Sequence, residues 1–217
     1  MIKLVAFLGN YGREYEKTRH NVAWQFASSL PFADKIYWQK KFKGNYAAIE
    51  SVQLAQWCAD YGIISKKDGS PVIVPEEAPS HVYFLKPETY MNLSGESIIE
   101  IANFYKIKPE ETLIVHDELE LPFGMVSLKW SGGLGGHNGL RSTKAVFNTA
   151  DFWRLRFGLT KPVNRDIADY VLSAFTSDEQ IGLSQVFPQA AVLFAKVLFT
   201  KDPAKLLQEW SKKKCLA

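Results

Sequence analysis

The sequence lacks the features that mark membrane-spanning and secreted proteins. No apolar run in its 217 residues approaches the roughly 20 residues that a helix needs to cross a bilayer. The N-terminal stretch MIKLVAFLGNYGREY has a short apolar run but no small-residue cleavage site after it, which favours a buried first strand over a signal peptide. The two cysteines, Cys58 and Cys215, form no motif. Free thiols outside any motif are typical of a cytoplasmic protein, and we expect the chain to act in the cytoplasm.

Several catalytic motifs are also missing. No serine stands in a G-x-S-x-G elbow, and neither cysteine lies near the polar segments described below, so a covalent nucleophile is not expected. The four histidines show neither H-E-x-x-H nor Cys/His ligand spacing, which argues against a zinc site. We therefore expect neither a metal nor a cofactor.

Glycine is concentrated in one stretch, GGLGGHNG at residues 132–139, which holds five of the chain's 14 glycines. A dinucleotide-binding fingerprint requires G-x-G-x-x-G, but from either Gly133 or Gly136 a required glycine falls on Asn138. A Walker loop requires a lysine after its last glycine, and none follows this run. A nucleotide-binding oxidoreductase is therefore disfavoured. A flexible turn and the wall of a binding site both remain open.

The net charge is small, but the charged residues are unevenly distributed. The net charge is +3, with 13 basic against 16 acidic residues over 1–120 and 13 against 7 over 121–217. The basic second half suits a face that binds a polyanion, although an ordinary solvated surface explains the charge alone equally well.

Apolar runs alternate with helical patterns along the chain. Ile2–Leu8 is a nearly continuous apolar run, as in a strand covered on both faces, and the residues from Asn21 onward have helical spacing. Further strands are predicted at 81–85, 112–115, 125–130 and 152–159, and a late helix around 189–199. We predict a single α/β domain over residues 1–217, with a twisted mixed β-sheet flanked by helices and an extended excursion around 45–80.

Polar residues follow several of these strands. Asn10 comes directly after the first strand, Asn92 lies a few residues past the strand at 81–85, and Asp117 ends the strand at 112–115. The glycine run follows the strand at 125–130. Because sites in such sheets form beyond the carboxyl ends of strands, we expect one composite site with the glycine run as a wall.

A histidine acting on water is the chemistry that remains. An imidazole with an ordinary pKa of about 6.5 accepts a proton near neutral pH, and a carboxylate on its other nitrogen fixes the tautomer. Asparagine amides donate to a developing oxyanion without adding charge. His20, Asp117 and the asparagines Asn10, Asn92 and Asn138 would form such a set, which suits hydrolysis of an activated ester. From the pattern alone, a structural histidine and a turn aspartate are equally good interpretations.

Four segments resemble the bacterial-type peptidyl-tRNA hydrolase family. They are FLGNYGREYEKTRHN (7–21), KPETYMNLSGES (86–97), HDELELPFGMVSLKWSGGLGGHNGLRS (116–142) and FWRLRFGL (152–159). The segments occur in the family's order and cover roughly a third of the chain. The resemblance implies a monomeric hydrolase that cleaves the ester between a peptide and the 3′ ribose of tRNA. Its partner would be peptidyl-tRNA, bound at the acceptor stem and 3′ end.

The resemblance also implies a role for each site residue. By position, His20 matches the proton acceptor, Asp117 its partner, and Asn10 the residue that distinguishes blocked from free aminoacyl groups. The substrate-contact positions are Tyr15, Tyr90, Asn92 and Asn138. The family usually has glycine where this chain has Ala23 and Thr160, and its region 45–80 is shorter.

Basic residues on two strands suggest where the RNA binds. Lys129 lies on the polar side of its strand, and Arg154 and Arg156 share the polar side of theirs. If the two sides adjoin, they form a cationic path for acceptor-stem phosphates, which Lys161 and Arg165 would extend. The alternative interpretation of each of these basic residues is a solvent-facing charge that binds no ligand.

The competing function is a non-catalytic RNA-binding protein on the same fold. The presence of His20, Asp117 and all three asparagines favours the hydrolase, because a protein that only binds RNA has no need of a positioned base.

Overall fold

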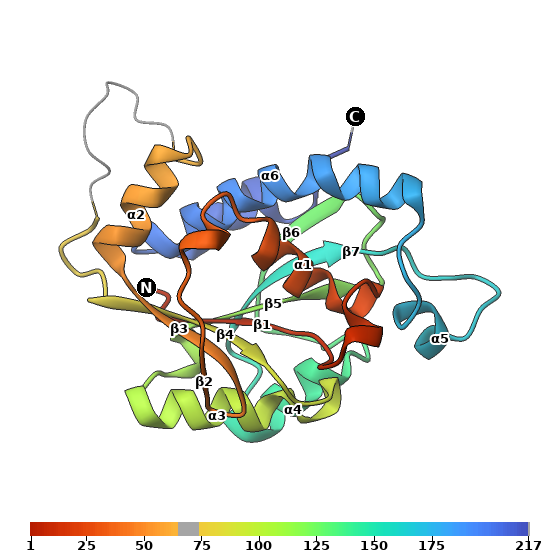
Figure 1. Ribbon diagram of the computed structural model, residues 1–217, viewed down its shortest axis with the longest axis horizontal. Coiled ribbons are helices and arrows are strands. Elements are labelled where there is room, and N and C mark those ends of the chain that lie inside the picture. Colours follow the sequence, from red (N-terminus) through yellow and green to blue (C-terminus); the bar gives the residue numbers. More distant parts are fainter. Residues whose placement is uncertain (65–73, 217) are drawn as a thin grey trace.

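The computed structural model describes residues 1–64 and 74–216, which fold around an eight-stranded mixed sheet (Figure 1). The strands are β1 (Leu4–Phe7), β2 (Gln39–Lys41), β3 (Gly44–Glu50), β4 (His81–Pro87), β5 (Thr112–Glu118), β6 (Met125–Trp130), β7 (Trp153–Gly158) and β8 (Lys213–Lys214). They lie in the order β2-β3-β4-β1-β5-β7-β6-β8. The four central strands β4, β1, β5 and β7 are parallel, and antiparallel pairs complete both sides. The predicted α/β fold with a mixed sheet is confirmed.

Helices cover both faces of this sheet. The α-helices of the described residues are α1 (Val22–Ser29), α2 (Ser51–Asp60), α3 (Ser94–Tyr105), α4 (Asn138–Phe147), α5 (Ile167–Val171), α6 (Ser177–Phe199) and α7 (Leu207–Trp210). Short 3-10 helices occur at Arg13–Tyr15, Arg19–Asn21, Ala33–Lys35, Met91–Leu93, Pro109–Glu111 and Pro203–Leu206. Helices α1, α2 and α6 lie on one face, and α3 and α4 on the other (Figure 1).

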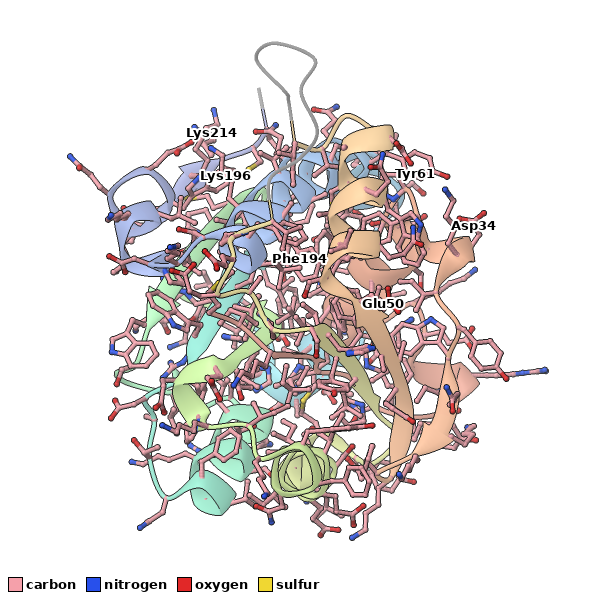
Figure 2. All side chains as sticks on the ribbon, turned by 90° about the vertical axis from the view of Figure 1, so that its left-hand side faces the viewer. Asp34, Glu50, Tyr61, Phe194, Lys196 and Lys214 are labelled. Carbon is pink, nitrogen blue, oxygen red and sulfur yellow. The ribbon has the colours of Figure 1, made fainter. Side chains whose placement is uncertain are left out.

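Strand β1 is apolar along its whole length because helices cover both faces of the sheet. Val5 and Phe7 pack in the core beneath α1, α2 and α6, where Phe7 meets Phe194 of α6 with ring centroids 6.0 Å apart. Figure 2 shows Phe194 pointing from α6 into this layer. Leu4 and Ala6 face the second core, beneath α3 and α4. A strand in the middle of a parallel sheet has no solvated face, so its residues are apolar without alternation.

Helix α6 is longer than the sequence indicated. It begins at Ser177, not near residue 189, and contains Pro188. Thr176 and Glu179 form a capping box at its start, and its buried side chains pack on the sheet, which offsets the hydrogen bond that Pro188 lacks. Within the described residues it is also the one helix long and apolar enough to cross a membrane by length and composition, with a mean hydropathy of 1.4. In this fold, 56% of the apolar 18-residue stretch of α6 is buried inside the protein, as in the core helix of a folded domain.

The predicted excursion around 45–80 falls partly on regular structure. Strand β3 pairs antiparallel with β4 along its length, and α2 follows it directly. Residues 65–73 lie outside the described residues, so the extent of the excursion and the assignment of one domain stay predictions.

Three of the four strands expected to end at the site do so. Strands β1, β4 and β5 are mutually parallel, which brings Asn10, Asn92 and Asp117 to one edge of the sheet. Strand β6 was expected to end there too, and this was wrong. Because β6 runs antiparallel to β7, its last residue, Trp130, pairs with Trp153 at the start of β7. The glycine run therefore begins at the opposite edge.

Candidate active site

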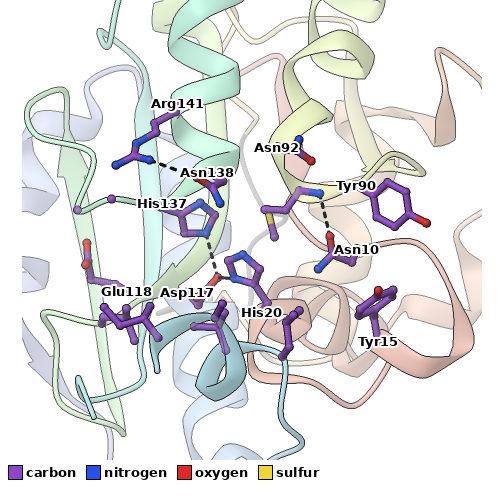
Figure 3. Close-up of a pocket in the computed structure, with 18 of the residues that line it drawn as sticks. Asn10, Tyr15, His20, Tyr90, Asn92, Asp117, Glu118, His137, Asn138 and Arg141 are labelled. Carbon is purple, nitrogen blue, oxygen red and sulfur yellow. Dashed lines mark hydrogen bonds and ion pairs between the residues drawn. The ribbon is translucent and has the colours of Figure 1, made fainter. Parts of the chain in front are cut away.

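All seven predicted site residues line one cavity of about 910 Å³ at the carboxyl edge of the parallel strands. They are Asn10, Tyr15, His20, Tyr90, Asn92, Asp117 and Asn138 (Figure 3). His137, Glu118, Arg141 and residues of α5 complete the wall. Although the glycine run starts at the far edge, it crosses back and brings Asn138 to this cavity.

A carboxylate joined to two imidazoles lies at the base of the cavity. Oδ1 of Asp117 lies 2.9 Å from Nδ1 of His20 and 2.9 Å from Nε2 of His137 (Figure 3). His20 comes from the 3-10 helix that precedes α1, Asp117 from the penultimate position of β5, and His137 from the residue before α4. The Asp117 side chain is only 2% exposed.

The tautomer of His137 follows from its other nitrogen. Its Nδ1 accepts hydrogen bonds from the backbone N–H groups of Gly139, at 3.1 Å, and Leu140, at 3.4 Å, which caps the N-terminus of α4. A nitrogen that accepts carries no proton, so the ring proton of His137 is on Nε2 and is donated to Asp117. The α4 cap thus fixes the tautomer of this ring.

Asp117 is held in its ionised form. Burial alone would raise the pKa of its carboxyl, but His20 and His137, which each donate a ring N–H to it, outweigh this and hold the pKa well below its usual range. An ionised carboxylate only accepts, so Nδ1 of His20 donates to it. In the neutral ring, the lone pair of His20 is then on Nε2. This is the arrangement that a general base requires.

His116 lies behind these groups. It is 1% exposed, and its Nδ1 donates to the backbone carbonyl of Asp117 at 2.6 Å. Burial, together with the nearby His137, lowers its pKa well below the ordinary value, so the ring is neutral. It packs edge-on against His137, with centroids 4.9 Å apart.

Asn10 is fixed so that its amide nitrogen stays available. Its backbone N–H donates to Oδ1 of Asn21 at 2.8 Å, and its carbonyl accepts from Nδ2 of Asn21 at 2.9 Å. The side-chain oxygen of Asn10 accepts from the backbone N–H of Met91 at 2.8 Å (Figure 3). With its oxygen committed, Asn10 presents the NH₂ group as a donor in the cavity wall.

The remaining predicted residues lie at the open rim. Asn92 and Asn138 are exposed, Tyr90 is 61% exposed, and Tyr15 is half-buried. The side-chain oxygen of Asn138 accepts a long hydrogen bond of 3.4 Å from Arg141. Exposed amides and phenols at a rim can turn to meet a ligand, unlike the buried groups below them.

By distance alone, the base of the cavity could hold a metal ion. One ligand atom each of His20, Asp117 and His137 lies within 4.8 Å of the others, a cluster that sequence spacing does not reveal. The hydrogen bonds argue against such a site. Nε2 of His137 carries a proton, because its Nδ1 accepts from α4, and a protonated nitrogen has no lone pair for a metal.

The cationic path is only partly as predicted. Lys129 is partly exposed, and burial, with Arg156 and Arg154 nearby, lowers its pKa. Arg156 donates to Oε2 of Glu118 at 3.2 Å. Lys161 and Arg165 are exposed. Arg154 was expected to form part of this path on the polar side of its strand, but it is only 1% exposed, because the glycine run folds over that face of the sheet.

The sequence interpretation missed several residues that build the site. His137 and Asn21 were not assigned roles, and neither was Arg19, which binds Ser173 and Glu179 and so ties the His20 segment to the start of α6. The sequence holds no cap signal at His137, because the usual N-cap residues are Ser, Thr, Asp and Asn. The Asn21 and Arg19 contacts join segments that no spacing rule connects.

Comparison with known proteins points to one family. The chain matches the peptidyl-tRNA hydrolase family model over residues 4–216. It is 41% identical over 220 residues to the peptidyl-tRNA hydrolase of Treponema pallidum (strain Nichols), covering 100% of this chain and 98% of the relative. It is 38% identical to that of Desulfitobacterium hafniense (strain Y51), covering 90% and 94%. The fold is similar to the crystal structure of peptidyl-tRNA hydrolase from Acinetobacter baumannii, with a TM-score of 0.74, 32% identity, and coverage of 96% and 93%.

Proposed function

The chain belongs to the peptidyl-tRNA hydrolase family and hydrolyses peptidyl-tRNA, and we propose that His20 drives this reaction by activating a water molecule. One observation carries the assignment: the ionised Asp117 binds Nδ1 of His20, which leaves the lone pair on Nε2. The resemblance of four sequence segments to this family is confirmed. The non-catalytic alternative is not favoured.

The reaction begins with proton transfer from water to Nε2 of His20. As the water oxygen attacks the ester carbonyl carbon, the proton moves to the ring, and Asp117 stabilises the imidazolium that forms. The carbonyl oxygen becomes an oxyanion, for which the NH₂ group of Asn10 is a fixed donor. When the tetrahedral intermediate collapses, the ribose oxygen leaves and takes the proton from His20. The products are a peptide with a free carboxylate and free tRNA.

The His137–Asp117 bond supports this step electrostatically. Because Nδ1 of His137 accepts from the α4 backbone and its Nε2 faces Asp117, neither nitrogen is open to the proton that His20 gains. His137 also occupies the same carboxylate oxygen as His20, which fixes the side chain of Asp117.

The RNA part of the substrate is assigned to the basic residues beside the cavity. Lys129 and Arg156 would contact acceptor-stem phosphates, with Lys161 and Arg165 further out. Arg156 is bound to Glu118, so a phosphate would compete with that carboxylate for the guanidinium. Tyr15, Tyr90, Asn92 and Asn138 would contact the peptide and the 3′ end. We propose that the enzyme acts as a cytoplasmic monomer.

An assay on two substrates tests the function. The purified chain should release tRNA from N-acetyl-aminoacyl-tRNA much faster than from the same tRNA with a free amino group, and 1,10-phenanthroline should not change the rate. Tight tRNA binding without any hydrolysis would support the RNA-binding alternative. Loss of activity with the chelator, restored by added metal, would overturn the metal-free mechanism.

A further inference from the structure

The glycine run spans the whole depth of the sheet. It leaves β6 beside the start of β7, where Trp130 pairs with Trp153, and it reaches Asp117 near the end of β5 through His137. Between these points the backbone has left-handed dihedral angles at Gly132, Gly135 and Gly136, with φ of 87°, 57° and 75°. Glycine adopts these without steric cost, but it also leaves the segment with little packing of its own.

Arg154 holds the glycine run at its first two residues, Gly132 and Gly133. Its Nη1 donates to the carbonyl of Gly133 at 2.7 Å, and its Nη2 donates to the carbonyl of Gly132 at 2.9 Å. The guanidinium also lies 5.1 Å from the Phe152 ring centroid. Two adjacent carbonyls held by one planar fork define both the position and the orientation of the peptide unit between them.

Burial of the Arg154 guanidinium carries a desolvation penalty that its hydrogen-bond partners must offset. Arg154 is among the largest fully buried side chains, and its Nε has no partner within the described residues. Burial, with Arg156 nearby, lowers its pKa to about 10, so it stays charged at neutral pH. An apolar residue would fill the same space at lower cost, but it could not hold the two backbone carbonyls that Arg154 binds.

Lys129 and the ion pair of Arg156 with Glu118 lie beside the run. The aliphatic end of Lys129 lies 3.4 Å from the Cβ position of Gly132, and Lys129 is the register partner of Arg154. Glu118, which binds Arg156, has a carboxylate oxygen 3.2 Å from the Cβ position of Gly135. The run thus lies between the proposed phosphate-binding residues and the catalytic groups.

We propose that Arg154 is a positioning residue that anchors the glycine run and thereby places His137 on Asp117 and Asn138 at the cavity rim. This rests on the proposed function of the site. Arg154 itself contacts no substrate. It binds the start of the run at Gly132 and Gly133, whereas the His137–Asp117 bond lies near the end of the run, at the catalytic groups.

Two substrates distinguish an anchor from a phosphate contact. One is full-length N-acetyl-aminoacyl-tRNA, and the other is an N-acetyl-aminoacyl trinucleotide that carries the ester but no acceptor stem. Arg154→Lys keeps the positive charge but cannot bind both carbonyls, of Gly132 and Gly133, as the guanidinium does. It should lower kcat by about tenfold or more, and by the same factor on both substrates. KM for full-length substrate should change less than about threefold. Arg154→Met should lower kcat further.

Placement of His137 gives a readout that does not depend on turnover. The Nε2 proton of His137, bonded to a carboxylate, should give a downfield proton NMR signal in the unmutated protein. This signal should shift or disappear in Arg154→Lys. Lys144→Met removes an exposed cation from α4 and serves as the matched control, with the signal and kcat retained. Arg154→Lys keeps the readout available even if Arg154→Met does not fold.

Two results would overturn the anchor. In the first, Arg154→Lys turns over both substrates at the normal rate with the His137 signal unchanged. In the second, the substitutions raise KM for full-length tRNA only and leave the trinucleotide unaffected, which would make Arg154 a phosphate contact. If the unmutated protein hydrolyses neither substrate, the proposed function fails instead.

Discussion

Replacing Asp117 with asparagine separates the charge of the carboxylate from its shape. The side chain is buried, and its Oδ1 accepts from His20 and His137, each at 2.9 Å. An asparagine oxygen can still accept both bonds, so Asp117→Asn should fold and bind substrate. What it removes is the negative charge beside the imidazolium that forms on His20.

The size of that loss follows from Coulomb's law. Two unit charges about 4 Å apart interact by about 4 kcal/mol at an effective dielectric constant near 20. The dipole of the asparagine carbonyl retains part of this, so we expect a loss of about 3 kcal/mol, or roughly a hundredfold in kcat. KM should change less than about threefold, because the effect arises only as charge develops.

Steady-state hydrolysis of N-acetyl-aminoacyl-tRNA across pH 5–9 measures both effects. The pH–rate profile of Asp117→Asn should differ from that of the unmutated protein, because the substitution removes the carboxylate that His20 and His137 keep ionised. Asp34→Asn, at an exposed position that does not line the cavity, is the matched control (Figure 2). A kcat within threefold of normal, with an unchanged pH profile, would refute the pairing as the source of catalysis.

Substitutions at three further positions test other parts of the structure. Asn10→Asp replaces the amide donor with a charge that repels an oxyanion, so kcat should fall at least about tenfold, and an unchanged kcat would remove Asn10 from the reaction. Burial lowers the pKa of Lys86 from 10.5 to about 8, so the unfolded chain binds more protons between these values and stability rises with pH there. Lys86→Met should therefore stabilise the protein by about 1–2 kcal/mol at pH 7 in urea denaturation, and by less at pH 10; an equal gain at both would contradict the burial argument. Thr160 has a φ of 63°, and its hydroxyl accepts from the N–H of Phe123 at 2.8 Å. Thr160→Ala keeps the strain and loses the bond, so it should destabilise by about 1 kcal/mol, whereas Thr160→Gly should be nearly neutral, because relief of strain offsets the lost bond; equal effects would reject this reasoning.

The sequence predicted the parts of the fold and the site that depend on local pattern. The apolar run at Ile2–Leu8 predicted a central strand, and the positions after β1, β4 and β5 located Asn10, Asn92 and Asp117 at one edge, because parallel strands share their carboxyl ends. The family resemblance supplied His20 as a specific candidate. Its catalytic role stays a prediction until it is measured.

What the sequence could not predict depends on strand direction and long-range contact. The alternation of β7 indicated that Arg154 was polar-facing, but only the antiparallel direction of β6 shows that the glycine run covers that face. The cap on His137 depends on where α4 begins, and the start of α6 depends on packing that tolerates Pro188. Pairing direction and burial of this kind leave no trace in residue spacing.

Turnover by His20→Ala tests the central claim most directly. The lone pair on Nε2 of His20 is the proposed acceptor of the proton from water, and alanine removes it without altering the basic residues that are proposed to bind RNA. We expect no hydrolysis of N-acetyl-aminoacyl-tRNA above the rate in buffer, with a Kd for tRNA within about threefold of that of the unmutated protein. Turnover by His20→Ala near the normal rate would contradict the mechanism.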